Sequence, residues 1–278
     1  MLPPEAVLKL VSILRLDDNA FVVGGQAFNI WAERYAPGDP ALREFGPFTS
    51  KDLDYFGHLQ AATKLATALH GRVNIPNLDD HTPHAAQVEA EVDGLWVQID
   101  FITNVIGVRS DLETLAVELL IPYRTKDGEG VLEVPVMHPL HCFQSRVANV
   151  VRLGRKDDTA MRQVHAAPIM LRHYIDEQLQ SGERHEAQRV LRRLADFLMR
   201  DPDGRRAHEV CGYDPLHIID LAEKDDRLDH RFRSFNLAGL ALRIRAGREL
   251  RRAAAVMSRL MPKAGPPSPA ATVPPRGG

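Results

Sequence analysis

Residues 48–57 read Phe-Thr-Ser-Lys-Asp-Leu-Asp-Tyr-Phe-Gly and place two aspartates, Asp52 and Asp54, one residue apart among strand-forming neighbours. On an extended backbone, residues i and i+2 point to the same face. Two carboxylates held this close repel each other, so the pair favours a bound cation, and Mg²⁺ prefers such oxygen ligands. The Asp-x-Asp motif is not specific by itself, so its meaning depends on the segments before and after it.

Composition indicates a globular protein without membrane segments. The chain has 278 residues, of which 44% are hydrophobic and 26% charged, enough for a full core and two domains. We expect no membrane span and no signal peptide, because no long apolar run and no basic leader is present. The two cysteines, Cys142 and Cys211, fit a reducing cytoplasm and are expected to be buried.

The two halves of the chain differ in charge. Residues 1–140 contain 10 lysines and arginines against 20 aspartates and glutamates, whereas residues 141–278 contain 25 against 17. The basic half could face a polyanion, or its charges could form ordinary solvated helix faces. The same two interpretations apply to the arginines of the last predicted helix, Arg243, Arg245, Arg248, Arg251, Arg252 and Arg259.

A strand, a glycine turn and a helix precede the aspartate pair. The pattern predicts a helix over 5–15, a buried strand over 21–23 and a helix over 26–35, joined by Gly24-Gly25. Glycines at such a junction let a phosphate approach the backbone closely, and the helix start behind them offers free N–H groups. The three prolines and two glycines of residues 36–47 predict a loop, either a gate for a substrate or an inert insertion.

A β-hairpin follows the pair. Two alternating runs, 86–92 and 95–102, are joined by Asp93-Gly94, the strongest hairpin signal of the chain. In the second run Trp96, Gln98 and Asp100 share one face of the strand. An acid between apolar flanks needs a partner, so we expect Asp100 to lie beside a cation.

The remaining elements predict an α+β protein whose second half is helical. We expect a helix over 60–70, a strand near 72–75, a helix over 111–120, a loop through residue 130 and an edge-like strand over 131–136. The helical period then predicts helices over 143–153, 161–179, 183–199, 216–222 and 237–261. The proline- and glycine-rich tail, 262–278, is expected to be disordered.

The order of these motifs resembles the nucleotidyltransferase superfamily with a DNA polymerase β-like palm. Residues 23–27, Val-Gly-Gly-Gln-Ala, and 50–55, Ser-Lys-Asp-Leu-Asp-Tyr, look most like the AbiEii-type toxin nucleotidyltransferases. Those proteins pair a mixed-sheet palm with a C-terminal helical domain. The resemblance covers roughly residues 20–160 and implies a palm domain over 1–140 followed by a helical domain over 141–261.

The resemblance also implies a mechanism. Asp52 and Asp54 would hold Mg²⁺ on the triphosphate of an NTP, and Asp100 would complete a two-ion site that activates the attacking hydroxyl. Phosphate contacts are expected from a further set of residues, Gly24, Gly25, Thr49, Ser50 and Lys51. The implied activity moves a nucleotide to an acceptor hydroxyl, with RNA, particularly tRNA, as the acceptor. The implied role is that of a toxin in a toxin–antitoxin or phage-defence system, with an antitoxin protein as a partner.

The resemblance also implies a lysine on the first helix of the helical half and a Lys/Arg-Asp pair about a dozen residues later. The corresponding residues are Arg146, Lys156 and Asp157. Arginine at 146 keeps the positive charge of the family's lysine but not its compact donor, so the role of this position is open.

Other functions remain open at this stage. The palm could bind nucleotide or RNA without turnover, or transfer to a protein or a small molecule. A sugar-nucleotide transferase is less favoured, because such folds need a long α/β region before the motif and only about fifty residues precede it. The pairs His81/His84 and His138/His141 lack the companion ligands of a zinc site and are interpreted as structural.

Overall fold

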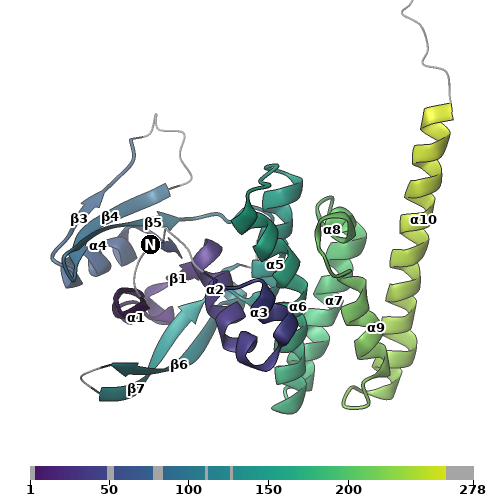
Figure 1. The fold of residues 1–278 in the computed structure, drawn as a ribbon, viewed down its shortest axis with the longest axis horizontal. Coiled ribbons are helices and arrows are strands. Elements are labelled where there is room, and N and C mark those ends of the chain that lie inside the picture. Colours follow the sequence, from purple (N-terminus) through teal and green to yellow (C-terminus); the bar gives the residue numbers. More distant parts are fainter. Residues whose placement is uncertain (1–3, 49–52, 78–83, 110–111, 126–127, 261–278) are drawn as a thin grey trace, which may run out of the picture.

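A single mixed sheet with helices packed on it organises the protein (Figure 1). The structure is a computed structural model and describes residues 4–48, 53–77, 84–109, 112–125 and 128–260. Within these ranges seven strands pair in the order β3-β4-β5-β2-β1-β7-β6. The strands are β1 (Phe21–Val23), β2 (Leu53–Phe56), β3 (Arg72–Asn74), β4 (His84–Val92), β5 (Leu95–Ile102), β6 (Val117–Thr125) and β7 (Gly128–Val136).

The short central strands β1 and β2 join two hairpins into one sheet. Strand β2 runs antiparallel to β1 and parallel to β5, while β1 runs parallel to β7 through the pair Val22 and Val136. The antiparallel hairpins β4–β5 and β6–β7 form the two sides of the sheet. Residues far apart in sequence therefore meet on neighbouring strands at its centre.

The predicted alternation of the β4–β5 hairpin is confirmed. One face of β5 is buried and carries Val97, Ile99 and Phe101. Helix α4 (Leu59–Ala68) packs against the neighbouring strand β4. Trp96 and Gln98 are exposed on the opposite face, and Asp100 on that face is half-buried. The hairpin turn places Asp93 and Gly94 at positive φ, as a tight two-residue connection requires.

Helix α2 (Gly24–Tyr35) connects the sheet to the helical half. It buries Phe28 and Trp31, and the Trp31 indole donates a hydrogen bond of 2.9 Å to the carbonyl oxygen of Met137. Helix α1 (Pro4–Val11) precedes β1 and is shorter than the predicted span 5–15; a 3-10 turn at Leu16–Asp18 follows it.

After β7 every regular element of the described chain is helical, as predicted. The helices are α5 (Pro139–Val151), α6 (Asp158–Gln180), α7 (Arg184–Arg200), α8 (Ala207–Val210), α9 (Leu216–Lys224) and α10 (Ala238–Leu260). Helices α5 and α6 pack directly against α2, so the boundary at residue 140 stays a prediction. Both cysteines are buried and unbridged, and the predicted tail lies outside the described residues.

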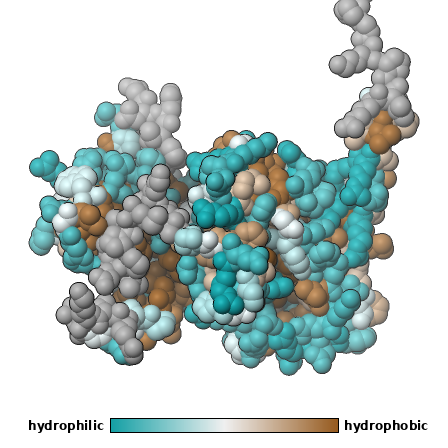
Figure 2. Space-filling model, in the orientation of Figure 1, coloured by the Kyte–Doolittle hydropathy of each residue, from teal (hydrophilic) through white to brown (hydrophobic). Residues whose placement is uncertain are grey.

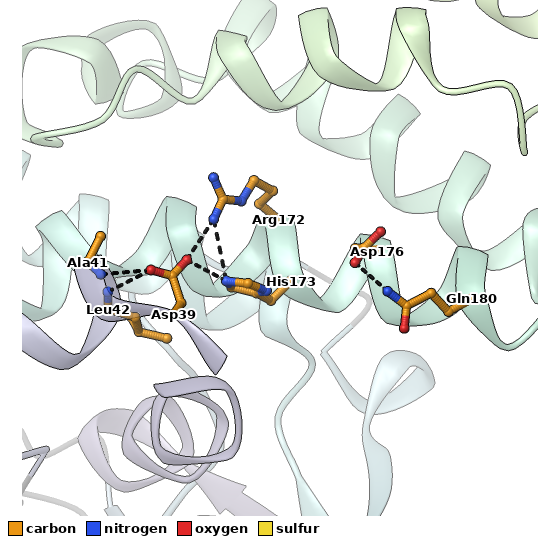
Figure 3. Close-up of polar contacts among 7 residues, drawn as sticks. All are labelled: Asp39, Ala41, Leu42, Arg172, His173, Asp176 and Gln180. Carbon is orange, nitrogen blue, oxygen red and sulfur yellow. Dashed lines mark hydrogen bonds and ion pairs between the residues drawn. The ribbon is translucent and has the colours of Figure 1, made fainter. Parts of the chain in front are cut away.

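The segment 36–47 is not the plain loop that its prolines predicted. It contains a 3-10 turn at Ala36–Gly38 and the short helix α3 (Pro40–Glu44), whose N-cap is Asp39. Figure 3 shows the Asp39 carboxylate accepting hydrogen bonds from the backbone of Ala41 and Leu42 and meeting Arg172 and His173 of α6, each at 2.7 Å. The segment therefore fastens the region after α2 to the helical half.

Two further predictions are wrong. The α-helix predicted over 111–120 is not found among the described residues 112–120, because Glu113–Leu115 is a 3-10 turn and β6 begins at Val117. The strand predicted over 131–136 is not at the edge, since β7 lies between β1 and β6, and the predicted loop before it is largely the β6–β7 hairpin. The apolar leucines of 112–119 point into the core from a turn and a strand instead of a helix.

Hydrophilic residues cover most of the helical half in the view of Figure 2, whereas apolar residues appear near the free end of α10. The exposed side chains there include Leu250, Val256 and Met257. None of the helices within the described ranges has the length and apolar character needed to cross a bilayer.

Candidate active site

Asp54 and Asp100 lie side by side at the centre of the sheet. They are register partners on the parallel strands β2 and β5, which places their backbones about 4.8 Å apart, and paired residues point to the same face. Both side chains are half-buried, Asp100 with 20% of its side chain exposed. The structure thus brings together two of the three predicted acids, although 46 residues separate them in sequence.

The glycine turn lies against the Asp54 carboxylate. Val23 pairs with Asp54, and Gly24 then starts α2 with φ of 67°, a conformation that side chains disfavour. A Cβ added to Gly24 would come closer than 3.0 Å to Asp54 Oδ2. Only glycine therefore allows this carboxylate to approach the start of α2, where free N–H groups favour negative charge.

Asp100 has two neighbours that the sequence interpretation missed. Gln87 on β4 donates a hydrogen bond of 2.8 Å from Nε2 to Asp100 Oδ1, and His84 Nε2 lies 3.7 Å from Oδ2. The signal for Gln87 was present, because a two-residue turn at 93–94 fixes the register and makes Gln87 the partner of Asp100. His84 was not predictable in this way, since the register shifts between His84 and Ala86.

Arg146 is buried at the junction of α5, α6 and α2. Its Nη1 donates to Gln163 Oε1 at 2.8 Å and its Nη2 to Ser145 Oγ at 3.2 Å, while Gln163 Nε2 donates to Asn29 Oδ1 at 3.1 Å. Burial lowers the pKa of the Arg146 guanidinium, and the Asp54 carboxylate is among the groups that oppose this shift. The predicted cation therefore lies close enough to Asp54 for their charges to interact.

The Arg146 cluster has unused hydrogen-bonding capacity. Arg146 Nε and Asn29 Nδ2 are buried and find no acceptor among the described residues. Buried donors without an acceptor cost about 1–3 kcal/mol, and they commonly indicate a functional demand or a bound molecule. These two donors are available to a polar ligand or to other residues near Asp54.

Lys156 and Asp157 have positions with simpler explanations. Asp157 begins α6, where its Oδ1 accepts a hydrogen bond of 3.0 Å from the backbone N–H of Ala160. Lys156, the residue before it, is exposed and lines a depression together with Met161 and His165. Asp157 therefore acts as a helix cap in this structure, and a catalytic role for either residue stays a prediction.

The remaining predicted site residues, Thr49, Ser50, Lys51 and Asp52, lie outside the described residues. Gly25 is in the first turn of α2, next to Gly24. Within the described ranges no group of three or more His, Cys, Asp and Glu side chains is placed to hold a metal ion. The Asp54–Asp100 pair nevertheless supplies the hard oxygen donors that Mg²⁺ prefers.

Two of the four histidines proposed as structural are fixed by the fold. His138 begins α5, accepting a hydrogen bond of 3.0 Å at Nδ1 from the backbone of Leu140, while its Nε2 lies 3.2 Å from Glu186 Oε1. Burial lowers the pKa of His138, against the opposing effect of Glu186. His141 is buried one turn along α5, His84 lies beside Asp100, and His81 is outside the described residues.

Comparison of the chain with protein-family models, with curated proteins and with solved structures gives no match.

Proposed function

We propose that this protein is a Mg²⁺-dependent nucleotidyltransferase that moves a nucleotide from an NTP to an acceptor hydroxyl of RNA. The observation that carries the proposal is the pairing of Asp54 with Asp100 on adjacent parallel strands, beside the Gly24 turn. Two carboxylates and a helix start that converge on one point suit a triphosphate held through metal ions. The RNA acceptor, and a toxin role with an antitoxin partner, rest on the motif resemblance.

The acidic residues would hold the metal. Asp54 and Asp100, with Asp52 as the third ligand expected from sequence, would bind Mg²⁺ through their carboxylate oxygens. Mg²⁺ held there would supply charge neutralisation of the triphosphate and would lower the pKa of the attacking hydroxyl. The hydrogen bond from Gln87 orients Oδ1 of Asp100, while Oδ2 faces His84 at 3.7 Å.

The start of α2 would bind the phosphates. Its N–H groups at Gly24 and Gly25 are not used by the helix itself, and they favour an anion at this position. Arg146 adds a fixed positive charge behind Asp54, held in place by Gln163 and Ser145. Preorganised charges of this kind need no rearrangement during the reaction. Such electrostatic stabilisation, together with positioning, supplies most of the catalysis of phosphoryl transfer.

The test is a label-transfer assay. Each of the four NTPs, labelled on the α-phosphate, is incubated with the protein, Mg²⁺ and total RNA, and the RNA is separated on a denaturing gel. We expect labelled RNA with the wild-type protein, and a loss of about 100-fold or more in Asp54→Asn and in Asp100→Asn. The matched control is Glu118→Gln, which removes an exposed carboxylate on β6 at the other edge of the sheet and should transfer at the wild-type rate.

The result that would overturn the proposal is transfer at equal rates by the wild type and both asparagine variants, or the absence of transfer to any acceptor. Label on a protein or on a small molecule would preserve the chemistry and replace the acceptor. Binding of NTP that is independent of Mg²⁺ and gives no product would instead indicate a palm used for binding alone.

A further inference from the structure

The open face of the β3–β4–β5 part of the sheet carries one large aromatic side chain. Trp96 on β5 is 67% exposed, although tryptophan is a residue that proteins usually bury in large part. No other aromatic ring stacks on it among the described residues. Its cross-strand partner is Glu91, which is also exposed.

Trp96 is aligned with the candidate active site. The side chains of Trp96, Gln98 and Asp100 point to the same face of β5, because they are two residues apart on one strand. Four residues of strand place Trp96 about 13 Å from Asp100. Bases stacked about 3.4 Å apart cover that distance in a short single strand whose terminal hydroxyl lies at Asp100.

Strand pairing holds the backbone at Trp96. The residue follows the two-residue turn at Asp93–Gly94, and Lys9 of α1 fastens the turn through a 2.8 Å ion pair with Asp93. A tryptophan side chain has only two χ angles to order, so an uncovered ring on a paired strand loses little conformational freedom when a flat ligand stacks on it. Ring stacking is worth about 1–3 kcal/mol for each base and does not depend on base identity.

The charges around Trp96 favour recognition of bases over phosphates. Glu89 and Glu91 lie on the same face of β4, and Asp93 is at the turn. These acids repel a phosphate backbone, so binding here gains little from ion pairs. Binding must then come from stacking on the ring, and an unpaired end offers exposed bases whereas a duplex does not.

We propose that Trp96 is the stacking platform for a nucleobase near the 3′ end of the single-stranded RNA acceptor. This assignment rests on the proposed function, which supplies the hydroxyl at Asp100, and it adds the residue that positions the acceptor. The base of the NTP could stack on the same ring, so the test must distinguish an RNA base from the base of the NTP.

Intrinsic fluorescence gives a direct measurement. The chain has two tryptophans, and Trp31 is 1% exposed, so a quencher that stacks on a surface ring acts on Trp96. We expect a short single-stranded RNA to quench the emission without added NTP, and an abasic strand of equal length to leave it unchanged. Asp54→Asn should be quenched like the wild type, which keeps this result independent of catalysis.

Affinity for a dye-labelled RNA provides the second measurement. Trp96→Leu should bind about tenfold more weakly, and Trp96→Phe, which keeps a flat ring, should bind close to the wild-type affinity. The control is Leu120→Ala, an exposed apolar residue on β6 at the other end of the sheet, with unchanged binding.

Three results would overturn the inference. They are the absence of quenching by RNA, wild-type affinity in Trp96→Leu, and complete quenching by NTP alone, which would assign the ring to the nucleotide donor. If quenching and the affinity loss are found but no label is transferred, the stacking platform stands and the proposed chemistry fails.

Discussion

At the scale of single residues, Gly24 has the most restrictive environment of the site. Gly24→Ala adds a methyl group at a positive φ and against Asp54 Oδ2, so both the turn and the carboxylate must move. We expect a loss of about 1–2 kcal/mol in the free energy of unfolding and at least tenfold lower transfer. Urea denaturation and the label-transfer assay measure the two effects.

The matched control for this substitution is Gly239→Ala. Gly239 is in α10, where an added Cβ meets nothing within 4 Å. Alanine is the better helix former, so we expect stability equal to the wild type or higher by about 0.5–1 kcal/mol. Equal behaviour of the two alanine variants would refute the close approach of Asp54 to the backbone of Gly24.

Arg146 gives a second test at this scale. Arg146→Lys keeps the charge but cannot reach Gln163 and Ser145 together, because an ammonium lacks the guanidinium fork. The buried Gln163 oxygen then loses its donor, and we expect about 1–3 kcal/mol lower stability in urea denaturation. Arg155→Lys, at an exposed position, should stay within about 0.5 kcal/mol of the wild type.

At the scale of elements, Asp157 separates a structural role from a catalytic one. Asparagine accepts the same backbone hydrogen bond at the start of a helix, whereas alanine does not. If Asp157 is only the cap of α6, Asp157→Asn keeps both stability and transfer, and Asp157→Ala loses about 1 kcal/mol of stability. A stable but inactive Asp157→Asn would instead place this carboxylate in the reaction.

Elements with strong local signals were predictable from sequence. The Asp93–Gly94 turn fixed the β4–β5 hairpin and hence the face on which Asp100 and Trp96 lie. Local signals failed where distant partners decide the structure. A helix was predicted over 111–120 and a loop after it, but pairing with β7 makes 117–125 a strand. In 36–47 the three prolines led to the prediction of a loop. Asp39-Pro40 is nevertheless a helix-start signal, because aspartate favours the N-cap and proline the first helical position.

The pairing of Asp54 with Asp100 was predictable only in part. Sequence indicated that both acids lie on strands, but not that β2 and β5 are adjacent, parallel and in register. The buried Arg146–Gln163–Asn29 chain depends on how α5 and α6 pack on α2, which no local pattern encodes.

At the scale of the whole molecule, carboxylates hold the helical half to α2 and α3. Burial raises the pKa of the Asp39 carboxyl, but hydrogen bonds from His173 and from the backbone of Leu42 and Ala41 lower it by more, so the pKa lies below its ordinary 3.8. In the same way burial raises the pKa of Glu177, and hydrogen bonds from Arg34 and Tyr35 bring it below its ordinary 4.5.

Acid should therefore weaken the contact between the two halves. A carboxyl whose pKa is lower in the folded state binds protons more readily when unfolded, so its contribution to stability is complete above its ordinary pKa and is lost as the pH falls below it. We expect the urea midpoint to drop as the pH falls below about 4.5, the ordinary value for Glu177. The variant Asp39→Asn/Glu177→Gln should be less stable at pH 7 and show a smaller drop.

The matched control for the acid series is Asp220→Asn, which removes a carboxylate paired with Arg245 on the far side of the helical half. Its midpoint should follow the wild-type dependence on pH. Parallel curves for the wild type and the Asp39/Glu177 variant would show that these two carboxylates do not carry the acid sensitivity.

The place of β1 in the sheet has a consequence for synthesis on the ribosome. A nascent chain that has emerged through residue 102 contains strands β1 to β5, including Asp54 and Asp100. One edge of β1 is then unpaired, because β7 and the 2.8 Å hydrogen bond from Met137 N–H to the Val22 carbonyl oxygen form only later. Until then that edge is open to foreign strands. Arg146 emerges later still, so Asp54 is translated before the buried cation with which its charge interacts.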